Sequence, residues 1–89
     1  MQIAVEVINE TTFAVSVSNG TTTTHTVTVP PEYYRKLTSN RVSAATLVEK
    51  SFEFLLAREP NTSILRTFTL PIIQRYFSEY EQTISVMLG

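Results

Sequence analysis

Apolar and polar side chains alternate through the first thirty residues, and this period of two restricts that part of the chain to strands with one buried face. The apolar side chains fall on odd positions in three runs, at residues 3–7, 13–17 and 27–29. A polar connection at 9–11 and the pair Asn19-Gly20 separate these runs and are turn signals. The sequence therefore predicts a three-stranded antiparallel meander, with its third strand extending from 21 to 29.

The spacing of the apolar residues also predicts the register of the meander. Phe13, Val15 and Val27 can share a buried face only if odd positions of the second strand pair with odd positions of the third. A two-residue loop would pair odd with even positions and turn Val27 into solvent. We therefore expect an odd-length loop, such as 18–20, with Gly20 in the left-handed conformation and a bulge.

Helical spacing replaces the alternation at Pro30-Pro31, where the fixed φ of proline suits the first turn of a short helix. A longer helix should follow from the N-cap residue Ser43 to Arg58 and cover the meander. Its buried side consists of Ala44, Leu47, Val48, Phe52, Leu55 and Leu56. Phe54 lies at the border of this side, so it either packs in a second layer or contacts a partner.

The last third of the chain has weaker patterns. Residues 64–68 fit a short strand or an extended segment. Thr69 can cap a short helix with Pro71 in its first turn, and the buried side of that helix would contain Ile72, Ile73, Tyr76 and Phe77. Residues 83–88 alternate and favour a final strand over a helix. The whole chain is predicted to be one α+β domain over residues 1–89: the meander, a short helix, a longer covering helix and a short C-terminal helix, with 83–88 as a candidate final strand.

Composition excludes several kinds of active site. The chain has no cysteine, which excludes disulfides, thiol nucleophiles and zinc–thiolate sites. His25 is the only histidine, so no multi-histidine metal site can form within the chain, and two glycines leave no phosphate-cradling loop. Because His25 shares the face of Val27, we expect a structural residue, with a partner contact or a catalytic role as alternatives. We expect neither a cofactor nor enzymatic activity.

The N-terminal residues lack the basic segment and the long apolar stretch of a signal peptide or transmembrane helix, so we expect a cytoplasmic protein with no membrane partner. Charged residues make up 17% of the chain and the net charge is −1, which provides no overall field to attract nucleic acid. This sparse charge favours a protein partner or self-association.

Most of the charge in the second half lies beside large apolar residues, at Arg58, Glu59, Arg66 and Arg75. Two interpretations are open, which are an internal network of ion pairs and a binding patch. For the second interpretation, Phe54, Arg58, Arg66 and Arg75 are the candidate interaction residues.

The order of strand, Pro-Pro, short helix, turn and capped helix over about residues 24–59 resembles ribbon-helix-helix DNA-binding proteins, including antitoxin-type repressors. In that family two copies pair their strands and place them in the major groove. The resemblance implies DNA contacts by Thr24, Thr26, Thr28, Arg35, Lys36 and Arg41. This chain departs from the pattern because two strands precede the ribbon, the first helix is short, and the predicted hairpin occupies one ribbon edge.

A second resemblance covers more of the chain. The segments SFEFLLAREPN, SILR, RYF and EYE, together with THTVTVP, are similar to a set of short uncharacterised bacterial proteins. This resemblance implies a bacterial, free-standing domain and carries no assigned activity. The leading hypothesis is therefore a non-catalytic protein-interaction or regulatory module, and the alternative is a ribbon-helix-helix-like DNA-binding protein or antitoxin-type repressor.

Overall fold

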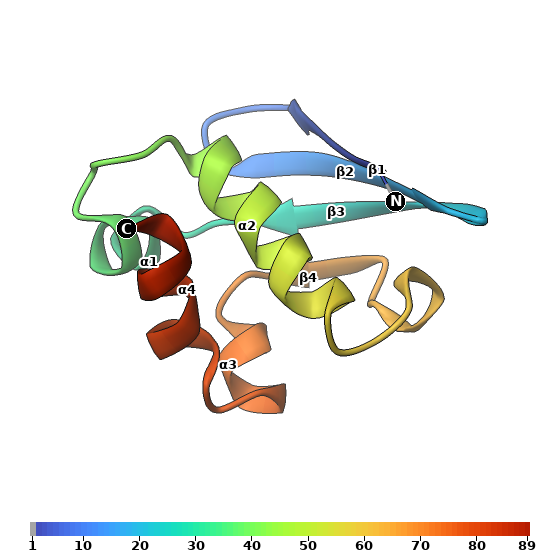
Figure 1. Cartoon of the computed structure of the whole chain (residues 1–89). Helices are drawn as coiled ribbons and strands as arrows, with labels where there is room; N and C mark the ends of the chain where they lie inside the picture. The colour runs from blue at the N-terminus through green and yellow to red at the C-terminus, as the bar shows by residue number, and fades with distance from the viewer. Residues whose placement is uncertain (1) are drawn as a thin grey trace.

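The computed structural model describes residues 2–89 and consists of one mixed sheet with helices on one face, so the fold is α+β (Figure 1). The strands are β1 (Gln2–Val7), β2 (Thr12–Asn19), β3 (Thr21–Thr28) and β4 (Thr67–Thr69). The helices are α1 (Pro31–Thr38), α2 (Ala44–Leu56), α3 (Ile72–Tyr76) and α4 (Tyr80–Leu88), and η1 (Asn61–Ser63) is a 3-10 turn. The strand order is β1-β2-β3-β4, in which the first three strands are antiparallel and β4 joins β3 in parallel.

The meander has the predicted register. Strands β2 and β3 pair Phe13 with Val27, as expected. They also pair Ser18 with Thr22 and Asn19 with Thr21, so the connection is Gly20 alone and not the expected loop 18–20. Gly20 has a φ of 81°, a left-handed conformation that glycine adopts without steric cost. Phe13 and Val27 are both buried, as the alternation of the sequence requires.

Helix α2 covers the apolar face of the sheet and begins at the predicted cap (Figure 1). The Oγ of Ser43 accepts a hydrogen bond of 3.1 Å from the backbone N–H of Thr46. Phe52 is fully buried on this helix, with its ring centroid 5.4 Å from that of His25 and 6.0 Å from that of Phe68. The central part of the core therefore joins α2 to β3 and β4.

A second layer buries the opposite side of α2. The ring centroid of Phe54 lies 5.9 Å from that of Phe77 and 5.2 Å from that of Tyr80, the first residue of α4. The Tyr80 hydroxyl lies 2.6 Å from Ser51 Oγ, and this Oγ donates to the carbonyl of Leu47. Phe54 is 1% exposed, so it belongs to the second layer and is not available to a partner in this conformation.

Several expectations for the last third of the chain are wrong. Residues 83–88 belong to α4, because Tyr80 and Ile84 lie one helical turn apart and are both buried where α4 contacts α2. Thr69 ends β4 and caps no helix, since α3 begins only after Pro71. Tyr76 is 66% exposed and is not on a buried side. The expectation of a short strand or an extended segment at 64–68 is confirmed in part, because Ile64 is extended and the last two residues belong to β4, which continues through Thr69.

Candidate functional site

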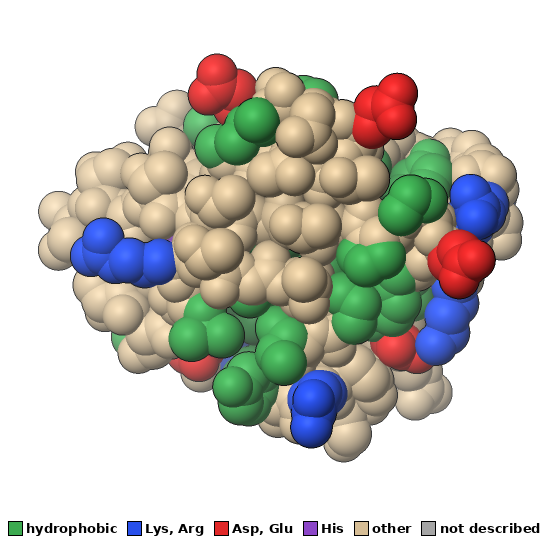
Figure 2. Space-filling view, turned by 180° about the vertical axis from the view of Figure 1, so that it is seen from behind, with side chains coloured by type: hydrophobic (Ala, Val, Ile, Leu, Met, Phe, Trp, Pro, Cys, Tyr) green, Lys and Arg blue, Asp and Glu red, His purple; other side chains and the backbone are tan. Residues whose placement is uncertain are grey.

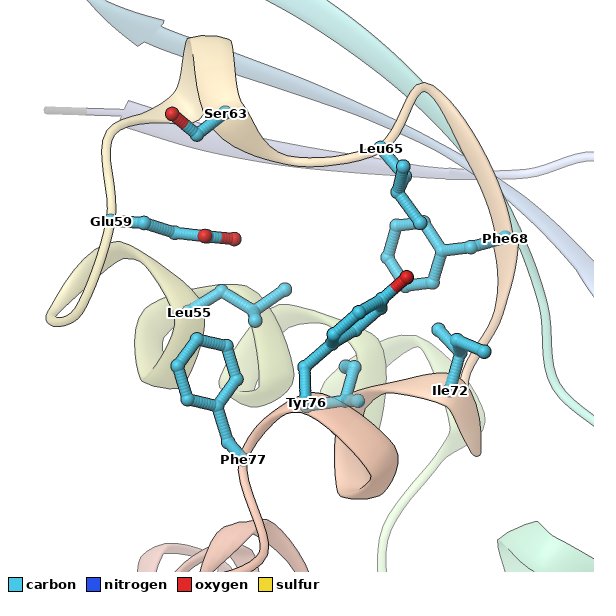
Figure 3. Close-up of a pocket in the computed structure, with 9 residues that line it drawn as sticks. Leu55, Glu59, Ser63, Leu65, Phe68, Ile72, Tyr76 and Phe77 are labelled. Carbon is cyan, nitrogen blue, oxygen red and sulfur yellow. The ribbon is translucent and has the colours of Figure 1, made fainter.

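A largely apolar pocket of about 300 Å³ opens between the end of α2, the segment that leads into β4, and α3 (Figure 3). Its lining residues are Leu55, Glu59, Ser63, Leu65, Phe68, Ile72, Ile73, Tyr76 and Phe77. This volume is at the lower end of the range for small-molecule sites and is large enough for one large side chain.

The wall formed by β4 and α3 is positioned by a short parallel pairing with β3. The backbone N–H of Thr26 donates to the carbonyl of Arg66 at 2.7 Å, and the N–H of Leu70 donates to the carbonyl of Thr28 at 2.9 Å. Pro71 then turns the chain away from the sheet and into α3. The pocket therefore lies where the chain leaves the sheet edge that β4 forms.

Glu59 is the one charged residue among those that line the pocket. Its side chain points into the pocket in Figure 3, and no residue in 2–89 forms an ion pair with its carboxylate. Burial raises the pKa of this carboxyl above its usual value, because the ionised form loses part of its hydration. A cation or a hydrogen-bond donor placed beside Glu59 would replace that lost hydration.

Two large apolar side chains at the pocket are open to solvent. Leu65 is 48% exposed and Tyr76 is 66% exposed. In Figure 3 both lie beside Phe68, with Tyr76 coming from α3 and Leu65 from the segment before β4. Exposed apolar groups that border an apolar hollow are typical of an interaction site.

A chain of partly buried hydrogen bonds holds the Leu65 side of the pocket to the meander. Asn61 Nδ2 donates to Thr23 Oγ1 at 3.0 Å, and Thr23 Oγ1 lies 2.9 Å from His25 Nε2. His25 Nδ1 lies 2.8 Å from the carbonyl oxygen of Leu65. Because a carbonyl only accepts, Nδ1 carries a proton, and in the ring with a single proton Nε2 then accepts from the Thr23 hydroxyl. His25 is therefore a structural residue that links β3 to the pocket wall.

Arg58 is exposed, but contacts within the chain hold its side chain in place. Its Cζ lies 3.6 Å from the centroid of the Phe54 ring, and Nη1 donates to the Phe54 carbonyl at 3.0 Å. Its Nε donates to Glu79 Oε2 at 3.2 Å, and the pKa of Glu79 is lowered by a hydrogen bond from its own backbone and by Arg58. Four charged residues, Arg58, Glu59, Arg66 and Arg75, were expected to form a network or a patch. Within residues 2–89, Arg58 alone among them forms an ion pair, and its partner is Glu79.

Arg66 and Arg75 are exposed and, unlike Arg58, have no ion-pair partner within residues 2–89. Each is the sequence neighbour of a pocket residue, since Arg66 follows Leu65 and Arg75 precedes Tyr76. The structure thus separates the predicted interaction residues into two that make contacts within the chain, Phe54 and Arg58, and two exposed arginines that are next in sequence to pocket residues.

The residues assigned to DNA by the ribbon-helix-helix resemblance do not form one basic surface. Thr24, Thr26 and Thr28 lie on the sheet face opposite α2, and Figure 2 shows this face from behind with no Lys or Arg at its centre. The basic residues Arg35, Lys36 and Arg41 lie on α1 and the loop after it. Strand β2 pairs along the whole of β3, and β4 pairs with residues 26–28 on its other edge, so this part of β3 cannot pair with a second copy to form the expected ribbon.

Lys36 also has an internal role, in a polar contact between α1 and α4. Its Nζ lies 3.0 Å from Glu81 Oε1, and the Tyr33 hydroxyl donates to Glu81 Oε2 at 2.9 Å. Burial opposes ionisation of Glu81, but these two partners outweigh it and hold its pKa below the usual value. The pKa of Tyr33 is raised, mainly by burial.

Sequence patterns did not identify Leu65 and Tyr76 as members of one site. They are brought together by β4 and α3, two elements too short for a clear periodic signal. A usable signal was the density of large apolar residues between 64 and 77.

The described residues contain neither a candidate metal site nor a candidate membrane-spanning helix. Within 2–89, no three His, Cys, Asp or Glu side chains are close enough together to hold a metal ion. No helix in this part of the chain combines the length and the apolar composition needed to cross a bilayer.

Comparisons with known proteins add no information about relatives, so the geometry alone carries the functional argument. No family model matches the sequence, and neither the curated proteins nor the solved structures include a match.

Proposed function

We propose that this chain is a non-catalytic protein-interaction module whose pocket receives a hydrophobic side chain from a partner polypeptide. The observation that supports the proposal is the apolar pocket with Leu65 and Tyr76 exposed beside it. A hydrophobic anchor that enters such a pocket removes apolar surface from water on both partners, which is the main source of binding free energy at small interfaces.

The charge of the pocket defines the chemistry next to the anchor. Glu59 favours a Lys, an Arg or another N–H donor beside the anchor, because that group would compensate a carboxylate that burial has partly dehydrated. Arg66 and Arg75, which are exposed and follow Leu65 and precede Tyr76 in the sequence, favour acidic groups of the partner farther from the anchor. This alternation of charge would orient the partner segment.

A binding titration with defined peptides tests the proposal. Fluorescent peptides with Leu or Phe next to Lys should bind more tightly than the same peptides with Glu in place of Lys. Backbone NMR shifts should change for residues around Leu65 and Tyr76, and Glu59→Gln should reduce the preference for Lys.

A matched pair of exposed apolar residues controls this experiment. Tyr76→Ala should weaken peptide binding by about tenfold, because it removes an aromatic group at the pocket. Val86→Ala removes an even more exposed apolar side chain on α4, outside the pocket lining, and should leave affinity unchanged. Equal effects of the two variants, or peptide-induced shifts away from the pocket, would contradict the proposal.

A further inference from the structure

The free edge of β1 is a second surface, at the opposite side of the sheet from β4. Within residues 2–89, Figure 1 shows no element alongside its outer edge, while α2 covers the apolar face of the sheet. Natural edge strands are usually protected by proline, lysine, bulges or covering segments. Strand β1 has no proline or lysine, and its one charged residue is Glu6.

The hydrogen bonds of the meander define which backbone groups of β1 point outward. The N–H of Ile8 donates to the carbonyl of Thr12, so even residues of β1 are bonded to β2. In an antiparallel ladder, successive residues bond alternately to one side and to the other. The N–H and C=O groups of Ile3, Val5 and Val7 therefore point outward from the sheet.

We infer that two copies of this chain pair through β1. The two β1 strands would be antiparallel and related by a two-fold axis that passes between the two Val5 residues. In this register Val5 faces Val5 of the second copy and Ile3 faces Val7. All three outward-pointing residues then form bonded pairs, and each pair exchanges two hydrogen bonds. The two sheets become one continuous sheet.

Two adjacent registers would also pair the outward-pointing N–H and C=O groups of the two copies. Side-chain charge disfavours one of them, and the number of bonded pairs disfavours the other. Moving the axis to Glu6 places the two Glu6 carboxylates directly opposite each other, which is destabilising. Moving it to Ala4 loses one bonded pair within the strand. The axis at Val5 places Glu6 opposite Ala4 and brings Val7, which is 60% exposed, against an apolar neighbour.

The occupant is a second copy because the edge is complementary to itself. The apolar residues Ile3, Val5 and Val7 all lie on the face that α2 covers, so a two-fold partner continues this apolar layer without interruption. The pocket lies beyond β4, at the other edge of the sheet, and stays open in the dimer.

Sedimentation equilibrium of the full chain tests the pairing. The wild-type chain should show a monomer–dimer equilibrium. Val5→Pro removes an outward N–H from each copy, and an edge strand tolerates proline at such a position. It should weaken the dimer by about tenfold to a hundredfold, while circular dichroism stays unchanged. A chain that stays monomeric, or a dimer that Val5→Pro does not affect, would overturn the inference.

Disulfide trapping tests the register independently of the proline variant, because the chain has no cysteine of its own. With the axis at Val5, Ala4 faces Glu6 of the other copy at a Cα separation of about 4.5 Å, within disulfide range. Two Ala4 residues would be about 8 Å apart, outside that range. An equimolar mixture of Ala4→Cys and Glu6→Cys chains should form mixed dimers on oxidation, and each variant alone should not. Cross-linking of Ala4→Cys alone would refute this register.

Discussion

Replacing His25 by Leu tests the hydrogen-bond chain that joins the meander to the pocket wall. Leucine has a similar volume and keeps the contact with Phe52, but it removes both ring nitrogens. The Leu65 carbonyl and the Thr23 hydroxyl each lose the partner that the ring supplied, at a cost of about 1–3 kcal/mol for each group. Better burial of an apolar side chain offsets about 1–2 kcal/mol of this cost. We expect a net destabilisation of about 2–3 kcal/mol, out of a total stability on the order of 5–10 kcal/mol.

Urea unfolding of four proteins measures this effect and isolates the contact. They are the wild type, His25→Leu, the near-isosteric Thr23→Val, and the double variant. Because the two side chains share a hydrogen bond, their effects on the free energy of unfolding should not add, with a coupling energy of about 1 kcal/mol. A coupling below about 0.3 kcal/mol would refute the network. Folded His25→Leu protein should also bind the hydrophobic-basic peptide more weakly, because Leu65 is no longer held by its carbonyl.

Further substitutions test the packing and the charges. Phe52→Ala should lower the free energy of unfolding by about 3–5 kcal/mol, whereas Glu53→Ala, on the polar side of the same helix, should change it by less than about 0.5 kcal/mol; similar urea midpoints would contradict the assignment of helix faces. Because folding raises the pKa of Glu59, its ionised form costs stability at neutral pH, and this cost disappears as pH falls through that pKa. Glu59→Gln should therefore stabilise the protein slightly at pH 7, by no more than about 0.5 kcal/mol, and less at pH 4; the reverse pH dependence in thermal melts would contradict the burial of this carboxyl. Folding instead lowers the pKa of Glu81, so Glu81→Gln should destabilise the protein above the unfolded pKa and have less effect as pH falls through the folded one; equal losses at pH 7 and pH 3 would argue against its contact with Lys36.

The elements that could be predicted are those specified by neighbouring residues. The period of two and the position of Gly20 were sufficient for the meander and its register, since a one-residue slip would expose Val27. Ser43 was sufficient for the start of α2, because a side-chain cap acts within one helical turn.

The elements that could not be predicted depend on contacts between distant residues. The apolar spacing of 80–88 fits a helix as well as a strand, and burial of Tyr80 against Ser51 decides for the helix. Strand β4 is three residues long, and its parallel partner lies about forty residues earlier in the chain. The pocket was not predictable for the same reason, because Leu65 and Tyr76 meet only after β4 has paired.

The parallel joint between β3 and β4 has a consequence for the order of folding. The β1–β3 meander closes through short turns, whereas β4 must return to β3 after both α1 and α2, a closure with a larger entropic cost. Three residue pairs hold this joint, so the segment from η1 to α3 should assemble last and open first in the native protein. Amide hydrogens of Thr26 and Leu70 should then exchange with solvent faster than those between β2 and β3. Each such opening would uncover Phe52 and Phe68. A partner bound in the pocket would keep β4 paired with β3 and would therefore slow the exchange.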